Sequence, residues 1–293
     1  MMDCPHKIDL HMHTTVSDGT DSPEEIISRV KEAGIELFSV TDHDAVKGCA
    51  IIQGLLKAGD PAFITGVEFS CKDEEGQYHI LGYGYDTESP SIREAVAAGH
   101  GFRISKLQKR LDFLENEFGF TFSNEDVTAL RALANPGKPH IGNLMVKYGY
   151  ASTKEEAILN YINKFHEGSG YVRPEDAIKS ILGAGGIPVL AHPSYGRGDE
   201  LIIGDAMDRR LRRLIDYGLR GVEAFYSGFT AKLQNEMLLF AERFGLYVTA
   251  GSDYHGQNKL VQLGNTNLPA AEDRPDGLQR FLDAVTGASI REP

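Results

Sequence analysis

Short apolar runs alternate with amphipathic segments along most of the chain. Ser22, Pro23 and Glu25 form the clearest helix start, a capping box with proline at the first helical position, and Gly34 follows the apolar stripe. Repeated strand–helix units predict a parallel sheet, either open or closed into a barrel. The runs of strand character are residues 7–11, 35–40, 63–67, 78–83, 187–191, 221–225 and 246–250.

The alternation is interrupted between residues 91 and 170. Ile104, Leu107, Leu111, Leu114 and Phe118 recur at helical spacing and predict the buried face of one long helix. We therefore expect a strand-rich domain made of residues 1–90 and 171–293. Residues 91–170 are expected to form a mostly helical insertion that caps the substrate.

Histidine and acidic side chains gather where the predicted strands end. A strand directs alternate side chains to one face, so His11 and His13 point the same way, as do Asp253 and His255. A lone histidine is usually structural, but this many imidazoles and carboxylates at strand ends predict a multinuclear metal site. The candidates are His11, His13, Asp18, His43, Glu68, His79, His192, Asp253 and His255.

The number of these candidates bears on the shape of the sheet. An open doubly wound sheet would bring together only the residues near its switch point. A barrel collects side chains from all the strand ends at one rim. The candidates therefore favour a barrel-like sheet.

Composition narrows the class of protein. The chain has 293 residues, 41% of them hydrophobic, and a formal net charge of -12. No basic run is present, so we do not expect a long nucleic acid as a partner. A small phosphorylated substrate is compatible with this charge. Cys4, Cys49 and Cys71 form no C-x-x-C motif. With no apolar signal region or membrane span, we expect a cytoplasmic enzyme without a membrane partner, and the oligomeric state stays open.

Six motifs give the sequence a family resemblance. DLHMHTTVSDGT, SVTDHD, GVEFS, YHILGYGY, VLAHPS and GSDYH resemble the polymerase and histidinol phosphatase (PHP) family, in that family's order. The resemblance implies a distorted (βα)7 barrel, two or three divalent ions and hydrolysis of phosphoesters. The chain length, the insertion and the PHIGNLMV stretch are most similar to the branch acting on nucleoside 3',5'-bisphosphates and cyclic phosphodiesters.

The resemblance also implies a ligand set for each ion. The oxygen and imidazole ligands, without thiolate, suit Mn²⁺, Fe²⁺ or Zn²⁺. The first ion would take His11, His13, Glu68 and Asp253. The second would share Glu68 and take His79 and His192, and the third would take Asp18, His43 and His255.

Further residues are expected to meet the substrate. A metal-activated hydroxide would attack phosphorus, and His192 or Asp253 would protonate the leaving group. His140 is either a ligand of the second ion or a contact to the substrate phosphate, and we favour the phosphate. Arg173 and Arg197 are expected phosphate partners. They stand in stretches that depart from the family's YVPK-like and HPGR-like patterns, so the substrate is left open between a phosphomonoester and a cyclic phosphodiester.

Two other classes of function remain open at this point. Related barrels use similar histidine pairs to hydrolyse C–N bonds, so a metal-dependent amidohydrolase is one alternative. The other is a non-catalytic module stabilised by metal, which would be expected to have lost ligands. Release of phosphate from a substrate panel would indicate the phosphoesterase, and release of ammonia would indicate the amidohydrolase.

Overall fold

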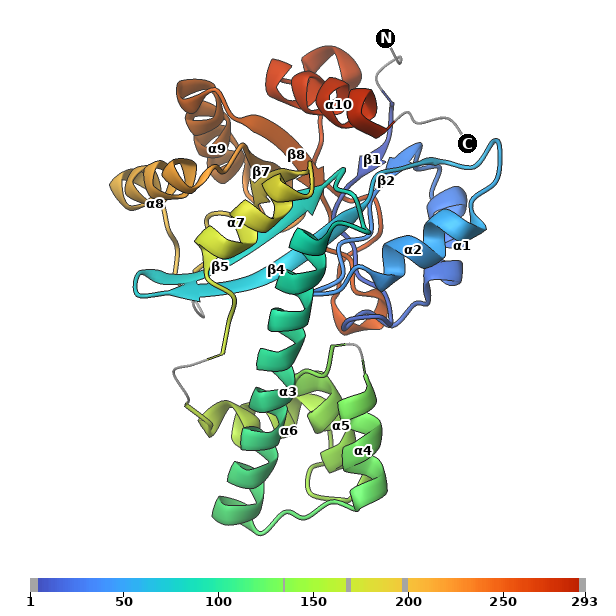
Figure 1. Ribbon diagram of the computed structural model, residues 1–293, viewed down its shortest axis with the longest axis vertical. Coiled ribbons are helices and arrows are strands. Elements are labelled where there is room, and N and C mark those ends of the chain that lie inside the picture. The colour runs from blue at the N-terminus through green and yellow to red at the C-terminus, as the bar shows by residue number, and fades with distance from the viewer. Residues whose placement is uncertain (1–4, 134, 167–169, 197–199, 290–293) are drawn as a thin grey trace.

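The chain folds into two β-sheets surrounded by helices, with a helical lobe projecting below them (Figure 1). A computed structural model describes residues 5–133, 135–166, 170–196 and 200–289. The smaller sheet has the order β1 (Ile8–Asp9), β2 (Leu37–Phe38) and β3 (Ala62–Phe63). The larger sheet has the order β4 (Gly66–Asp73), β5 (Gly76–Tyr83), β6 (Ile187–Leu190), β7 (Gly221–Tyr226) and β8 (Tyr247–Gly251).

The expectation of parallel strands throughout is wrong for β5. This strand pairs antiparallel with both β4 and β6, whereas the remaining pairs within the two sheets are parallel. The physical reason is the connection: Asp73 pairs with Gly76, so only two residues join β4 to β5. A parallel crossover needs a dozen residues or more.

The predicted strand over residues 63–67 is also divided. Its first part pairs with β2 as β3, and its last part begins β4 in the other sheet. Glu68 consequently lies inside β4 rather than at the end of a strand. Its place in the hairpin, and not a strand terminus, determines which way it points.

The two sheets meet along both of their margins. On one side, the Leu10 N–H donates to Ala250 O at 2.9 Å, and Met12 forms a parallel bridge with Tyr254. On the other side, His43 bridges to Glu68. These contacts bring the segments that follow β1 and β2 against β8 and β4.

Helices cover the outer faces of the sheets (Figure 1). The predicted capping box of the first helix is confirmed, because Ser22 Oγ accepts from the Glu25 N–H while Glu25 accepts from the Ser22 N–H. The last helix was not predicted from the sequence. The covering helices are α1 (Pro23–Glu32), α2 (Lys47–Leu55), α7 (Pro174–Gly183), α8 (Gly204–Tyr217), α9 (Ala231–Phe244) and α10 (Asp276–Ser289).

The helical lobe has an apolar core of its own. The predicted apolar face of α3 is largely confirmed, since Leu107, Leu111 and Leu114 are buried there against Ile141 and Met145. The long helix α3 leads from the sheets into the lobe (Figure 1). The lobe comprises α3 (Pro90–Phe118), α4 (Asn124–Ala132), α5 (Lys138–Lys147), α6 (Lys154–Asn160) and the short turn η1 (Ile162–Lys164).

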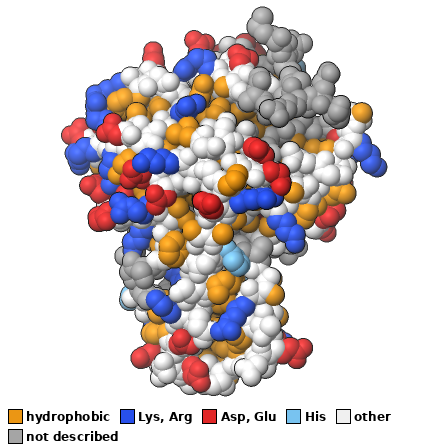
Figure 2. Space-filling model, in the orientation of Figure 1, with side chains coloured by type: hydrophobic (Ala, Val, Ile, Leu, Met, Phe, Trp, Pro, Cys, Tyr) orange, Lys and Arg blue, Asp and Glu red, His pale blue; other side chains and the backbone are white. Residues whose placement is uncertain are grey.

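The surface carries charges of both signs. On the face shown in Figure 2, acidic and basic side chains are interspersed over the sheet region and the lobe.

Across the described ranges, no helix is both long enough and apolar enough to cross a membrane.

Candidate metal centre

All nine candidate ligands converge on one cluster between the two sheets and the base of the lobe. Eight of them have ligand atoms in groups whose members lie within 4.8 Å of one another, and His192 contacts two members. The first group is His11, His13, Glu68 and Asp253. The second is His43, Glu68 and His79, and the third is His13, Asp18, His43 and His255.

The first group is the most deeply buried. Glu68 Oε2 lies 3.3 Å from His11 Nε2 and 3.2 Å from His13 Nε2, and Asp253 Oδ1 lies 3.4 Å from His13 Nε2. The two Nε2 atoms and Glu68 Oε2 are inaccessible to solvent and have no hydrogen-bond partner. Buried polar atoms are nearly always satisfied. Unpaired imidazole and carboxylate lone pairs facing one another therefore fit a divalent cation.

The second group is arranged by the β4–β5 hairpin. His79 pairs with Ser70 in the hairpin register, which places it diagonally across from Glu68 on the same face. Glu68 Oε1 lies 2.8 Å from His79 Nδ1 and 3.2 Å from His192 Nε2. One oxygen of Glu68 thus faces the first group and the other faces His79 and His192.

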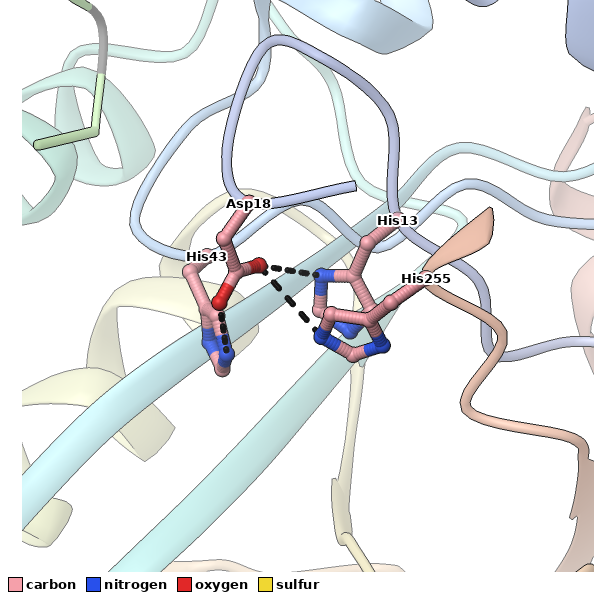
Figure 3. A group of neighbouring side chains, drawn as sticks. All are labelled: His13, Asp18, His43 and His255. Atoms are coloured by element: carbon pink, nitrogen blue, oxygen red, sulfur yellow. Dashed lines mark ion pairs between the residues drawn. The ribbon is translucent and has the colours of Figure 1, made fainter. Parts of the chain in front are cut away.

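The third group opens toward solvent. Asp18 Oδ1 lies 3.3 Å from His255 Nε2 and 3.8 Å from His13 Nδ1, and Asp18 Oδ2 lies 4.0 Å from His43 Nε2 (Figure 3). The Asp18 side chain is 26% exposed, whereas that of His13 is fully buried. His13 was expected beside the first ion only, and its position here lies between two groups.

The carboxylates of the cluster are in the form that binds cations, whereas a buried imidazole would have to lose a proton. Burial opposes ionisation of Glu68, but the neighbouring imidazoles, led by His43, hold the pKa of its carboxyl well below its usual range. Burial lowers the pKa of His43 well below its usual value, against the pull of Glu68 and Asp18. Anionic carboxylates and a neutral imidazole are the forms that bind metals. Burial opposes protonation of His13, but Asp253 and Glu68 raise its pKa to about 9, so a cation would displace a proton there.

Glu223 supports the cluster from β7 and was missed from the sequence. It is fully buried, with Oε1 2.9 Å from His11 Nδ1 and Oε2 accepting from the His192 backbone N–H at 2.7 Å. A carboxylate on the outer nitrogen of a ligating histidine fixes the tautomer and the ring orientation. The signal was available, because Glu223 is an acidic residue within an otherwise apolar strand.

Asp9 and Asp42 are two further buried carboxylates beside the cluster. Asp42 accepts from Ser17 Oγ at 2.7 Å, and that hydroxyl lies 3.3 Å from His13 Nδ1, so its influence on the ring passes through Ser17. Asp9 instead accepts from backbone N–H groups, including those of His11 and Ser252. Asp9 therefore holds the ends of β1 and β8 together and does not orient an imidazole ring.

The backbone is strained at the cluster. Among the described non-glycine residues, those with left-handed φ angles are Asp44 (47°), His192 (27°), Asp253 (58°) and Asn267 (58°). Each such residue costs about 1–3 kcal/mol and persists only where its surroundings enforce it. Two of the four are candidate ligands, and Asp44 follows a third.

A pocket of about 260 Å³ lies between the cluster and the helical lobe. Asp18, His43 and His79 line one side, and the opposite side carries cations that the sequence analysis missed. Three of these cations lie at positions i, i+3 and i+7 of α3, which places them on one face of the helix. That spacing was the signal in the sequence that could have revealed them. The cationic wall is Arg103, Lys106 and Arg110 of α3 together with Lys138 of α5.

The cationic wall is held in place by specific contacts. Arg103 Nε donates to Asp44 Oδ2 at 2.6 Å, and Lys106 Nζ lies 3.6 Å from the centre of the Tyr171 ring. Burial, with Arg110 and Arg103 next in effect, lowers the pKa of Lys106 to about 7. Arg110 Nε is buried without a hydrogen-bond partner.

The three residues expected to bind substrate are placed differently. His140 lies in the first turn of α5, where Nδ1 accepts from the Gly137 N–H at 3.1 Å, and burial lowers its pKa. Arg173 is 54% exposed, lies 3.7 Å from Glu74 and, like His140, is not among the residues that line the pocket. Arg197 lies outside the described residues.

Curated relatives share most of the length of this chain. A phosphoribosyl 1,2-cyclic phosphate 1,2-diphosphodiesterase of Eggerthella lenta is 30% identical, with coverage of 89% of this chain and 99% of that protein. A 3',5'-nucleoside bisphosphate phosphatase of Chromobacterium violaceum is 29% identical, with 92% of each covered. A 5'-3' exoribonuclease of Haemophilus influenzae is 28% identical, covering 88% of this chain and 93% of that protein.

A solved structure and a family model agree with these relatives. An amidohydrolase from Chromobacterium violaceum, solved with bound sulfate and no metal, aligns with a TM-score of 0.80 at 26% identity, covering 95% of this chain and 96% of that one. The PHP domain model matches residues 9–173, more than half of the chain. This protein belongs to the PHP domain family and is a metal-dependent hydrolase of phosphoester bonds.

Proposed function

We propose that this phosphoesterase acts on a small metabolite carrying a second anionic group beside the phosphate that is hydrolysed. A nucleoside 3',5'-bisphosphate and a ribosyl cyclic phosphate are the two substrate classes that the relatives suggest. They differ in bond type but share this chemistry, a compact ribose-based molecule with phosphate groups a few ångströms apart.

The observation that carries the proposal is the two-sided pocket. One side presents candidate metal ligands, and the other presents the cationic wall of α3 and α5. The whole chain has a net charge of -12, so a local group of cations facing a metal centre is not explained by overall composition. Arginine and lysine are the usual phosphate partners. Arg110 contributes a buried Nε that has no hydrogen-bond partner among the described residues, so it can donate to a further acceptor.

The fold supports this division of roles. We infer that the two sheets, joined along both margins, form the distorted seven-stranded barrel of the family, with β3 and β4 counted as one divided strand and the β4–β5 hairpin as the irregular part. Residues 91–170 would act as the substrate cap, since α3 and α5 supply the cationic wall. The barrel would hold the catalytic ions, and the cap would select the organic part of the substrate.

Two or three divalent ions of the Mn²⁺, Fe²⁺ or Zn²⁺ type would be held by the eight residues of the three groups, with His192 left as a proton donor, and would supply a nucleophile at neutral pH together with charge stabilisation at phosphorus. Glu68 would hold the first two positions at a fixed separation through its two oxygens. His11 would be kept in the ligating tautomer by Glu223. The cationic wall would orient the second anionic group.

The leaving group needs a proton, for which His192 and Asp253 were the candidates. Asp253 Oδ2 already accepts from Tyr226 and lies 2.5 Å from Lys259, so this oxygen is committed. The His192 side chain is 16% exposed, compared with 5% for Asp253. We therefore assign the proton to His192, with Asp253 as a ligand.

His140 is kept as a phosphate contact in this proposal. Its Nδ1 is used by the Gly137 N–H, which leaves Nε2 as the N–H donor. None of the metal-binding groups found among the described residues includes His140. A neutral imidazole N–H donor at the start of α5 suits a phosphate oxygen.

The test is hydrolysis by purified, Mn²⁺-loaded protein of three substrates: adenosine 3',5'-bisphosphate, ribose 1,2-cyclic phosphate 5-phosphate and an aryl phosphate. Phosphorus NMR follows both the release of phosphate and the opening of the cyclic ester, which by itself releases no phosphate. We expect one of the two ribose phosphates to be turned over with a kcat/KM at least about 100-fold above that of the aryl phosphate, because a charge-assisted contact contributes roughly 1.5–3 kcal/mol. Equal values for all three would contradict a role for the cationic wall. An ammonia assay on primary amides and amino-substituted heterocycles covers the C–N hydrolase alternative.

A second candidate substrate follows from the exoribonuclease relative. A short 5'-phosphorylated oligoribonucleotide also presents a terminal phosphate next to a phosphodiester. It belongs in the same panel, and preference for it over the ribose phosphates would replace the small-metabolite proposal.

A further inference from the structure

Asp253 turns its two carboxylate oxygens toward different partners. Oδ1 faces the cluster, 3.4 Å from His13 Nε2 and 3.5 Å from His11 Nε2. Oδ2 faces outward, where the Tyr226 hydroxyl donates to it at 2.9 Å and Lys259 Nζ lies 2.5 Å away. The Asp253 side chain is only 5% exposed, so protein groups and not solvent make this division.

The outer partners come from well-anchored elements. Tyr226 is the last residue of β7, and Lys259 directly follows the short helical turn η2 (Gly256–Asn258). That turn is tied to the loop carrying Asp18, because Asn258 Nδ2 donates to Asp18 O at 2.7 Å. Lys259, although its side chain is 41% exposed, is therefore presented by a fixed loop.

A carboxylate can bind a divalent ion through one oxygen or through both. With Oδ2 engaged by a phenol and an ammonium, only Oδ1 is available toward the imidazoles. We propose that Lys259 and Tyr226 are positioning residues that restrict Asp253 to binding through one oxygen and reduce the negative charge it presents. This inference rests on the metal centre of the proposed function.

The proposal predicts an unusual pattern of effects. Removing one outer partner leaves Oδ2 with a single contact and weakens its restraint, so the site should bind a divalent ion more tightly while the geometry required for turnover is lost. A residue that contacts substrate would instead raise KM. A residue that only stabilises the fold would lower the melting temperature and leave the metal affinity unchanged.

The experiment uses Lys259→Met and Tyr226→Phe, with Lys259→Arg as the conservative variant. Co²⁺ affinity is measured by competition with a chromogenic chelator, and the visible Co²⁺ spectrum reports the coordination number. We expect about threefold or greater tightening in both variants, with spectra shifted toward higher coordination, a lower kcat and an unchanged KM for the preferred substrate. Lys259→Arg should restore the wild-type spectrum and part of kcat.

Lys179→Met is the matched control, because Lys179 also pairs with a carboxylate, Glu175 at 2.6 Å, but on the surface of α7. Unchanged Co²⁺ affinity and spectrum in both variants overturn the proposal, and so does a raised KM with normal kcat. Tyr226→Phe removes a single hydroxyl and carries the test alone where Lys259→Met does not fold. Failure of the wild-type protein to bind Co²⁺ overturns the metal centre itself, which separates the two proposals.

Discussion

His11 Nδ1 lies 2.9 Å from Glu223 Oε1, with both side chains fully buried. The other oxygen of Glu223 accepts from the His192 backbone N–H, so this carboxylate accepts two N–H groups at once. A glutamine cannot do the same, since its amide would present an N–H₂ group to one of the two donors. Glu223 thereby connects the ring of one candidate ligand to the backbone of another.

Glu223→Gln should lower metal affinity by about 10–100-fold while the protein still folds. The measure is Mn²⁺ affinity by calorimetry, with the melting temperature recorded in parallel. Glu36→Gln, a surface carboxylate that accepts a single backbone N–H from His6, is the matched control. Wild-type affinity in Glu223→Gln would show that His11 does not need this partner.

Asp253→Asn and His13→Ala should each lower kcat by at least about 100-fold, because each removes a candidate ligand from the buried group around Glu68. Circular dichroism and thermal unfolding check that the fold survives. A near-normal rate in either variant with metal still bound would contradict its assignment as a ligand.

Chelation should remove two to three equivalents of metal and lower the melting temperature by roughly 5–10 °C, since an ion at 100 times its dissociation constant stabilises by about 2.7 kcal/mol. The physical reason is the set of unpaired buried ligand atoms, among them His11 Nε2 and Glu68 Oε2. Elemental analysis gives the stoichiometry, and Mn²⁺ added back should restore the transition. Less than one equivalent after growth in supplemented medium would count against a multinuclear centre.

Lys106→Met should raise KM for the preferred ribose phosphate by about tenfold or more, with little effect on an aryl phosphate that reaches only the metals. Lys106 lines the pocket, whereas Arg173 does not and is paired with Glu74 at the surface. Arg173→Met is therefore expected to leave both values of KM unchanged. The opposite result would return the selective role to Arg173.

Binding of a nucleoside monophosphate should weaken as pH rises through about 7, where Lys106 loses its proton. The sign follows from the charge: the pKa of Lys106 is lowered, so the cation that attracts phosphate is present below pH 7 and absent above it. Arginine side chains stay charged throughout this pH range, so the arginines of the wall set a floor to the effect. Calorimetry between pH 6.5 and 8.5, above the phosphate pKa of about 6, should show roughly tenfold weakening. Lys106→Met should show no such dependence.

The local parts of this structure were well predicted from sequence. The capping box at Ser22 and Glu25 and the apolar face of α3 follow from short-range patterns, and both are present. The strand ends at His11 and Asp253 were located because polar ligands interrupt apolar runs. By contrast, the division of β3 from β4 and the pairing of β5 with β6 depend on which distant strands pair, and no local pattern encodes that choice.

The candidate ligands were predicted from the sequence, but several residues that surround them in the site were not. Lys106 and Arg110 were missed because the apolar pattern of α3 reveals only its buried face. The adjacent basic face lines the pocket. Lys259 was missed because a lone lysine in a loop carries no signal until its partner is known. Residues that support a site through tertiary contacts are the part that sequence reveals least.

The left-handed backbone at His192 and Asp253 lowers the stability of the fold at two positions that the metal centre needs. Glycine adopts such angles freely, so replacing Asp253 with glycine would relax the chain there while destroying the chemistry. Substitutions chosen only for stability would therefore tend to damage this centre first. Engineering of this protein for stability would have to leave both residues unchanged.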